Sequence, residues 1–231
     1  MTSWRERTTN EAESILRSRE RFLDKAENIV QACRALYYET NGLDFTIQDL
    51  ATKAGIAIQT FYRYFRSKDE LLLAVLEDVL RESSGRIAAA VEGVDAPLRR
   101  LELLVKMPIL MSGDSAPVYA RLLVSEHLRL ERLYPREVED AQACVLIPLV
   151  QAIEDATAAG EISRRASPSR DARVIMSVMR SVYHRLALGV TDHEASTVAD
   201  HLWLFSLGAL SAGATESCQR SVSERSAGST S

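Results

Sequence analysis

The residues with the clearest chemical character lie between Phe45 and Lys68, where basic, amide and aromatic side chains are interspersed with apolar ones. This stretch has four basic residues against one acidic residue, a net formal charge of +3. Such donors suit phosphates and base edges, so the stretch is typical of a surface that contacts nucleic acid. The whole chain of 231 residues carries −4, which by itself indicates no polyanionic partner. Binding depends on the field at one face, so the local charge is the relevant quantity.

Two short helices joined by a tight turn would position these side chains. Thr46 is a good N-cap for a helix over 47–53, and Asp49 completes a capping box. Gly55 is small enough for two helices to cross closely, and it also suits the turn. A second helix over 58–64 would be about 10 Å long, which fits a major groove about 12 Å wide. This is the pattern of a helix-turn-helix.

A long helix over 68–91 follows the second short helix. Ser67 and Glu70 predict a capping box at its start. A helix N-terminus with Lys68 in its first turn is a natural seat for a phosphate.

Residues 22–81 closely resemble the N-terminal DNA-binding domain of the TetR family of bacterial transcriptional regulators. The matching segments are Thr46-Ile47-x-Asp49-Leu50-Ala51, Ala54-Gly55-Ile56, Thr60-Phe61-Tyr62-x-Tyr64-Phe65 and Ser67-Lys68-x-Glu70-Leu71. The chain departs from the family at Ala57, which cannot cap the second helix, and at Gln59, where the family often has Gly or Ala.

The resemblance implies a sequence-specific regulator that binds double-stranded operator DNA. We expect Thr46, Thr60, Tyr64 and Lys68 to position phosphates, and Gln59, Tyr62 and Arg63 to read the groove. The full set of expected DNA-binding residues is Thr46, Gln48, Ile58, Gln59, Thr60, Tyr62, Arg63, Tyr64 and Lys68.

The rest of the chain also reads as helix, because apolar residues recur every three or four positions and Gly and Pro are few. We therefore expect an all-α fold. The expected parts are a flexible charged arm over 1–20, a DNA-binding domain over 21–81 with its helix-turn-helix at about 45–64, an effector-binding and dimerisation domain over 82–213, and a disordered Ser-rich tail over 214–231.

The expected helix over 169–188 has one apolar face and the start of a second, and the last expected helix, 193–212, is apolar over most of its circumference. A helix of this kind is buried on two sides. Both sides could be covered within one subunit, or one could face a twofold partner; the family resemblance favours a homodimer.

The resemblance also implies a small effector held among the central helices. Pro108 and Pro148 would bend helices and so open a cavity. The candidate lining residues are Met107, Met111, Tyr119, Leu123, His127, Val145, Leu149, Met176, Met179 and Tyr183, each of which would serve equally as ordinary core. These side chains would suit a partly apolar effector, such as a fatty acyl, steroid-like or aromatic compound.

Other classes of function find no support in the sequence. No apolar run approaches the roughly 20 residues of a membrane span, and the charged start has no secretory core. Cys33, Cys144 and Cys218 are scattered, which fits a reducing cytoplasm. No second His or Cys stands at zinc spacing from His127, and no catalytic motif occurs, so we expect no metal, cofactor or enzyme activity.

Three alternatives stay open at this point. Released repression is the commoner behaviour in the family, but an activator would have the same sequence features. A ligand-binding protein or an enzyme of the same fold without DNA activity is the third reading.

Overall fold

The computed structural model contains helices and loops but no strand in the part of the chain that it describes. The described residues are 4–40, 45–112, 126–163, 167–190 and 193–212. The chain divides into two compact units, Met1–Asp78 and Val79–Ser231. The division falls inside helix α4 (Lys68–Val91) rather than at 81/82, where the sequence placed it.

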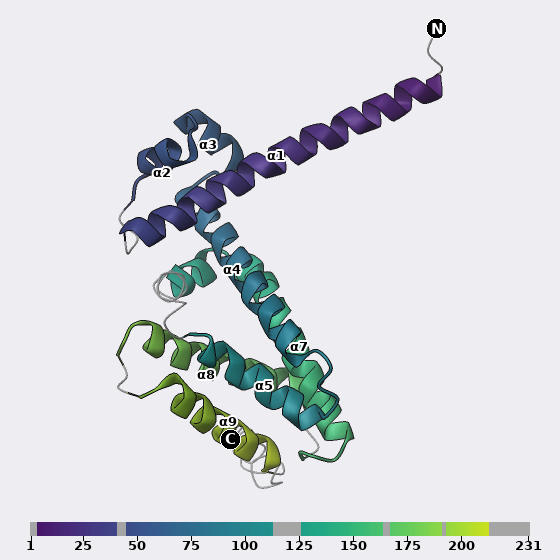
Figure 1. Cartoon of the computed structure of the whole chain (residues 1–231), viewed down its shortest axis with the longest axis vertical. Coiled ribbons are helices and arrows are strands. Elements are labelled where there is room, and N and C mark those ends of the chain that lie inside the picture. The colour runs from purple at the N-terminus through teal and green to yellow at the C-terminus, as the bar shows by residue number, and fades with distance from the viewer. Residues whose placement is uncertain (1–3, 41–44, 113–125, 164–166, 191–192, 213–231) are drawn as a thin grey trace, which may run out of the picture. The chain divides into compact units, whose positions relative to one another are not determined.

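The first unit begins with a helix of 37 residues, α1 (Trp4–Thr40). Residues 4–20, which belong to the flexible arm expected over 1–20, form the N-terminal part of α1 (Figure 1). No Gly or Pro occurs between Trp4 and Thr40, so nothing in this stretch stops the helix. The sequence pointed to a later start because the regular apolar face begins only near Phe22.

The core of the first unit joins α1, α2 (Ile47–Ala54), α3 (Ile58–Tyr64) and the first turns of α4. Its largest fully buried side chains are Ile29, Tyr37, Leu50, Phe61, Leu71, Leu72 and Leu76. The Asn28 side chain donates a 3.2 Å hydrogen bond to the Ala54 carbonyl and so ties the end of α2 to α1. These contacts set the position of α3, which is too short to be stable alone.

The turn between α2 and α3 depends on the left-handed backbone of Gly55, with φ of +66°. The N–H groups of Gly55 and Ile56 donate to the carbonyls of Thr52 and Ala51 at 3.2 and 2.9 Å, which closes the end of α2. A Cβ atom on Gly55 would meet nothing within 4 Å. Backbone conformation, rather than the close helix crossing that we expected, is thus what requires glycine here.

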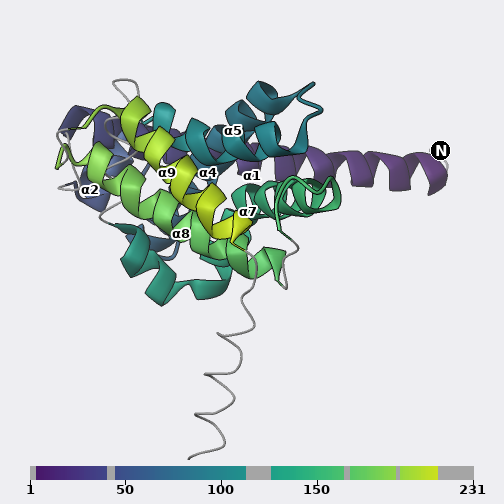
Figure 2. The same cartoon turned by 90° about the horizontal axis from the view of Figure 1, so that it is seen from below.

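The second unit is a bundle built around α5 (Pro97–Leu110), which packs against α7 (Pro135–Ala158), α8 (Pro168–Ala187) and α9 (Ala195–Ser211). Residues 126–133 form a further short helix. Figure 2 shows α8 and α9 side by side. Pro108 and Pro148 both lie inside helices, so α5 continues past Pro108. The Ser-rich tail expected over 214–231 lies outside the described residues.

A buried imidazole links three helical segments of the second unit. His127, from the helix at 126–133, is 4% exposed, and its Nε2 atom lies 2.5 Å from Nη1 of Arg180 and 3.0 Å from Nε2 of Gln142. Because an arginine can only donate, Nε2 must accept, and the imidazole is neutral. Burial, helped by Arg180 and His184, lowers the pKa of His127 to about 4.

Gly55→Ala should destabilise the protein by about 1 to 2 kcal/mol, because alanine is strained at positive φ. Gly55→Asn is the matched control and should lose less, since asparagine tolerates the left-handed region. Urea unfolding measured through helix content compares the two variants. Equal losses would show that the space around the turn, and not its φ angle, limits this position.

Lowering the pH from 7 to 5 should destabilise the protein through His127. Its folded-state pKa of about 4 lies below the ordinary value of 6.5, so between these values the unfolded chain binds a proton that the folded chain does not. The stability is complete above pH 6.5 and is lost as the pH falls, by about 2 kcal/mol at pH 5.

His127→Gln should therefore show a shallower loss of stability with falling pH than the unaltered protein. His201→Gln, at an exposed position of α9, is the control and should follow the unaltered protein. Urea unfolding at several pH values gives the comparison, and parallel curves for the unaltered protein and His127→Gln would refute the role of His127.

Candidate functional site

Helix α3 presents a polar face to solvent and anchors itself by the opposite face. Gln59, Tyr62 and Arg63 are exposed, whereas Phe61 is fully buried and lies edge-on to Tyr62. Gln48 of α2 is exposed as well. Ile58, Thr60 and Tyr64 are half-buried, with the Thr60 N–H donating to the Ala57 carbonyl at 2.9 Å. The expected lack of a side-chain cap at Ala57 is confirmed.

Tyr64 is held between two neighbours at the end of α3. Its ring centroid lies 4.4 Å from that of Phe22 on α1. The Arg63 guanidinium stands 5.5 Å from the Tyr64 ring centroid, and Nη2 of Arg63 lies 3.5 Å from the Tyr64 hydroxyl. The phenol is thus oriented by α1 and by its own helix, which lowers the conformational entropy it would lose on binding.

Thr46 caps α2, as the sequence predicted. Its hydroxyl accepts from the Asp49 N–H at 3.2 Å and donates to an Asp49 carboxylate oxygen at 2.7 Å, while the Thr46 N–H donates to the same oxygen at 2.8 Å. These hydrogen bonds lower the pKa of the Asp49 carboxyl. Thr46 is exposed, but its hydroxyl already has a partner within the capping box.

Lys68 braces the start of α2 from the start of α4. Its ammonium donates to the Phe45 carbonyl at 2.7 Å and stands 3.9 Å above the Phe45 ring centroid. An ammonium carries three donors, so this bond does not exhaust its ability to attract an anion. The cap of α4 is offset by one residue from the expected box: Glu70 donates its N–H to the Ser67 hydroxyl, but its carboxylate accepts from the Arg66 N–H.

The basic side chains of the first unit differ in how far nearby acids offset their positive charge. Lys53 forms a 2.5 Å ion pair with Glu39, which offsets its charge. Arg63 and Arg66 are exposed on either side of the end of α3. Arg66 was absent from the expected DNA-binding residues. The sequence could have indicated it, because it is a basic residue in the short link between α3 and the Ser67 cap of α4.

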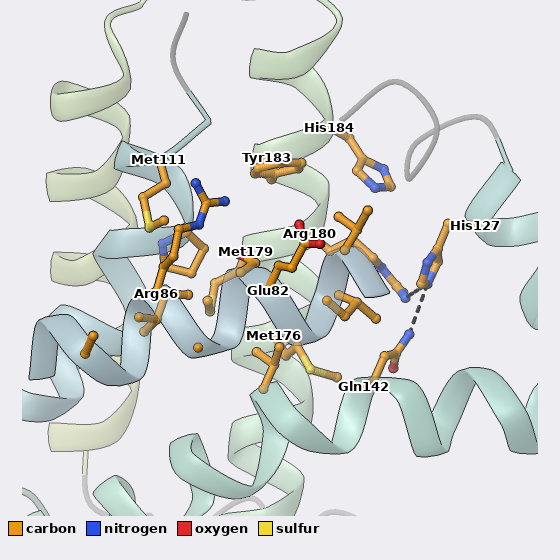
Figure 3. Close-up of a pocket in the computed structure, with 18 residues that line it drawn as sticks. Glu82, Arg86, Met111, His127, Gln142, Met176, Met179, Arg180, Tyr183 and His184 are labelled. Atoms are coloured by element: carbon orange, nitrogen blue, oxygen red, sulfur yellow. Dashed lines mark hydrogen bonds between the residues drawn. The ribbon is translucent and has the colours of Figure 1, made fainter. Parts of the chain in front are cut away.

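The second unit contains a cavity of about 660 Å³ among α4, α5, α7, α8 and the helix at 126–133 (Figure 3). Six of the expected residues line it: Met111, His127, Val145, Met176, Met179 and Tyr183. Met107 does not line it and packs against the core, because α5 contacts other helices on several sides. Leu149 is buried and lines a neighbouring cavity of about 570 Å³. Tyr119 and Leu123 lie outside the described residues.

Polar residues missed by the sequence analysis share the wall of the larger cavity. They are Glu82, Arg86, Gln142, Arg180 and His184. Helical periodicity had pointed to apolar positions only, and charged residues at the margin of a helix face look like solvent contacts. Burial raises the pKa of Tyr183 and lowers that of His184.

Two features are absent from the residues that the structure describes. No three His, Cys, Asp or Glu side chains gather there as metal ligands would. No helix in that part of the chain is long and apolar enough to cross a membrane.

Comparisons with known proteins match this anatomy. The family described as bacterial regulatory proteins, tetR family, matches residues 29–75, which run from α1 to the first turns of α4. The HTH-type transcriptional regulator BetI of Brucella suis biovar 1 (strain 1330) is 25% identical over 186 residues, covering 75% of this chain and 85% of that protein.

Solved structures share the fold, and the all-α prediction is confirmed. The fatty acid degradation regulator FadR from Bacillus halodurans superposes with a TM-score of 0.64 at 16% identity, over 79% of this chain and 94% of that one. A TetR transcription regulator from Haloarcula marismortui ATCC 43049 gives 0.64 at 22% identity, over 81% and 98%. Residues 29–75 thus form the N-terminal helix-turn-helix domain of the TetR family of bacterial transcriptional regulators.

Proposed function

We propose that this regulator is a homodimeric repressor that holds a double-stranded operator with α3 and releases it when a small, partly apolar effector enters the larger cavity. The observation that carries the proposal is the polar, exposed face of α3 on a helix anchored by Phe61. We ascribe no catalysis to the chain. A regulator of this kind acts in the cytoplasm, where the bacterial chromosome lies.

The side chains around α3 divide into two groups by their position. Gln48, Gln59, Tyr62 and Arg63 are exposed and suit base edges in a major groove, and Ile58 offers an apolar contact for a thymine methyl group. The phosphate positioners that we propose are Thr46 at the start of α2, Thr60 and Tyr64 on α3, and Lys68 at the start of α4. We add Arg66 to this second group, because it is basic and exposed.

Helix α4 supports a link between effector and DNA. Its first turns complete the core of the first unit through Leu71 and Leu72, and its later turns line the cavity through Leu80 and Arg86. A ligand that prefers one position of α4 would shift the population of DNA-binding conformations by its difference in affinity for the two.

An exposed apolar surface on α8 and α9 supports the dimer. Val174, Leu204 and Phe205 are 57%, 62% and 64% exposed, although the opposite sides of both helices are buried in the core. An apolar surface of this kind on a soluble protein marks an interaction site. A twofold axis through it would form an interface of four helices.

Operator binding gives the first test, by gel shift with DNA from upstream of the chain's own gene. Lys68→Ala should weaken binding to every sequence and reduce the slope of log K against log salt by about one. Gln59→Ala should instead change the preferred sequence and leave the slope unaltered. Arg136→Ala, an exposed charge in the second unit, is the control and should bind normally.

An unchanged salt slope in Lys68→Ala would remove that residue from the phosphate contacts. In vitro transcription from the same DNA should fall when the protein is added, and a rise would identify an activator instead. Absence of any shift with the natural upstream DNA would favour a ligand-binding protein without DNA activity.

The proposed interface predicts the effect of charge on α9. Leu204→Glu combined with Phe205→Glu should convert the dimer to a monomer, because burying two carboxylates costs several kcal/mol each. Leu128→Glu, on the helix at 126–133 and 68% exposed, is the control and should leave the dimer intact. Analytical ultracentrifugation measures both. A double variant that remains dimeric would place the interface elsewhere.

A further inference from the structure

At the end of the larger cavity beside His127, the positive charge is carried by Arg180. Figure 3 shows Arg180 and Gln142 both beside the Nε2 atom of His127, and Arg86 near Met111, away from His127. In the described part of the chain, the Arg180 guanidinium makes one hydrogen bond, to the neutral His127. A guanidinium has five N–H donors, so most of its capacity is unused there.

Nearby acids offset this charge only in part. The closest carboxylate, that of Glu131, lies 3.6 Å from Nη1 of Arg180, beyond good hydrogen-bond distance, and is 42% exposed. An exposed pair at such a distance contributes little. His184 lies with its ring edge-on to His127, and the pKa of each is lowered, so neither adds charge at neutral pH. Glu82 also reaches the wall and opposes the positive sign.

The neighbouring cavity provides an internal comparison. There Arg100 donates twice to the Val94 carbonyl, at 3.1 and 2.8 Å. The Ser84 hydroxyl donates to the Cys144 carbonyl at 2.7 Å. Arg100 and Ser84 thus have good acceptors within the protein, whereas the single hydrogen bond of Arg180 points to a ligand that brings its own acceptor.

Much of the remaining wall of the larger cavity is apolar, although Arg86 stands near Met111 at the end away from His127. Methionines at 111, 176 and 179 supply adaptable surfaces, with aliphatic side chains from α4 and α7 beside them. We propose that the effector is an organic acid with an apolar body, whose carboxylate pairs with Arg180 at the His127 end of the cavity. The inference deepens the proposed effector function and rests on it.

Binding of three probes with the same ten-carbon chain and different head groups tests the head group without DNA. Isothermal titration at pH 7.5 should show decanoate binding at least tenfold more tightly than decan-1-ol, because a charge-assisted hydrogen bond replaces a neutral one. Decyltrimethylammonium should bind most weakly. Since no operator is present, failure here is distinct from failure of the gel shift.

Two variants then show whether the charge of Arg180 or that of Glu82 sets the preference among the probes. Arg180→Gln should abolish the preference for decanoate and keep the affinity for decan-1-ol within about twofold, which also shows that the cavity is folded. Glu82→Gln should leave decanoate binding unchanged or tighter. Arg173→Gln, on the same helix but outside the cavity lining, is the control for loss of one positive charge.

Several results would overturn the inference. Decanoate binding no tighter than decan-1-ol, or not at all, would exclude an acid site in the unaltered protein, where folding of a variant is no concern. A preference retained in Arg180→Gln would remove Arg180 from it. If decyltrimethylammonium bound most tightly and Glu82→Gln abolished that binding, the effector would be a cation.

Discussion

The short helix α3 cannot hold its own shape, and much of the first unit serves to hold it. Seven residues form too few hydrogen bonds to offset the entropy of ordering, and Ala57 provides no side-chain cap. The fully buried Phe61 supplies what the helix lacks, by anchoring one face in the core of the first unit. The side chains opposite Phe61 can then be presented to a partner without first being ordered.

Interactions further from α3 also help to fix its position. Gly55 turns the chain between α2 and α3, Asn28 ties the end of α2 to α1, and Lys68 connects the start of α4 to the start of α2. None of these contacts touches the exposed face of α3, yet each limits how it can move. The chain as a whole carries −4, so attraction for phosphates is not the only contribution on which binding through α3 depends. The fixed position of α3 contributes as well, because it sets which groups the exposed side chains can reach.

Local signals made the first unit predictable from sequence. The Thr46 and Asp49 capping box, the helix stop at Gly55 and the missing cap at Ala57 each involve residues within a few positions of one another. The second unit was less predictable, since periodicity identifies the inward face of a helix but not whether neighbouring helices leave a space there. Met107 and Met111 illustrate this: both suit a core, and only Met111 lines the larger cavity. Arg180 escaped notice because its buried partner, His127, is 53 residues away in the chain.

The division of the chain inside α4 has a consequence for how such regulators can be recombined. One helix carries both the buried Leu76 of the first unit and Leu80 of the cavity wall. Inserting a single residue near Asp78 would turn Leu80 by about 100° about the axis of α4 relative to Leu76. An insertion of seven residues would nearly restore the phase but lengthen the helix by about 10 Å. Exchange of effector units between relatives must therefore conserve the number of residues between these two positions, whatever the residues are.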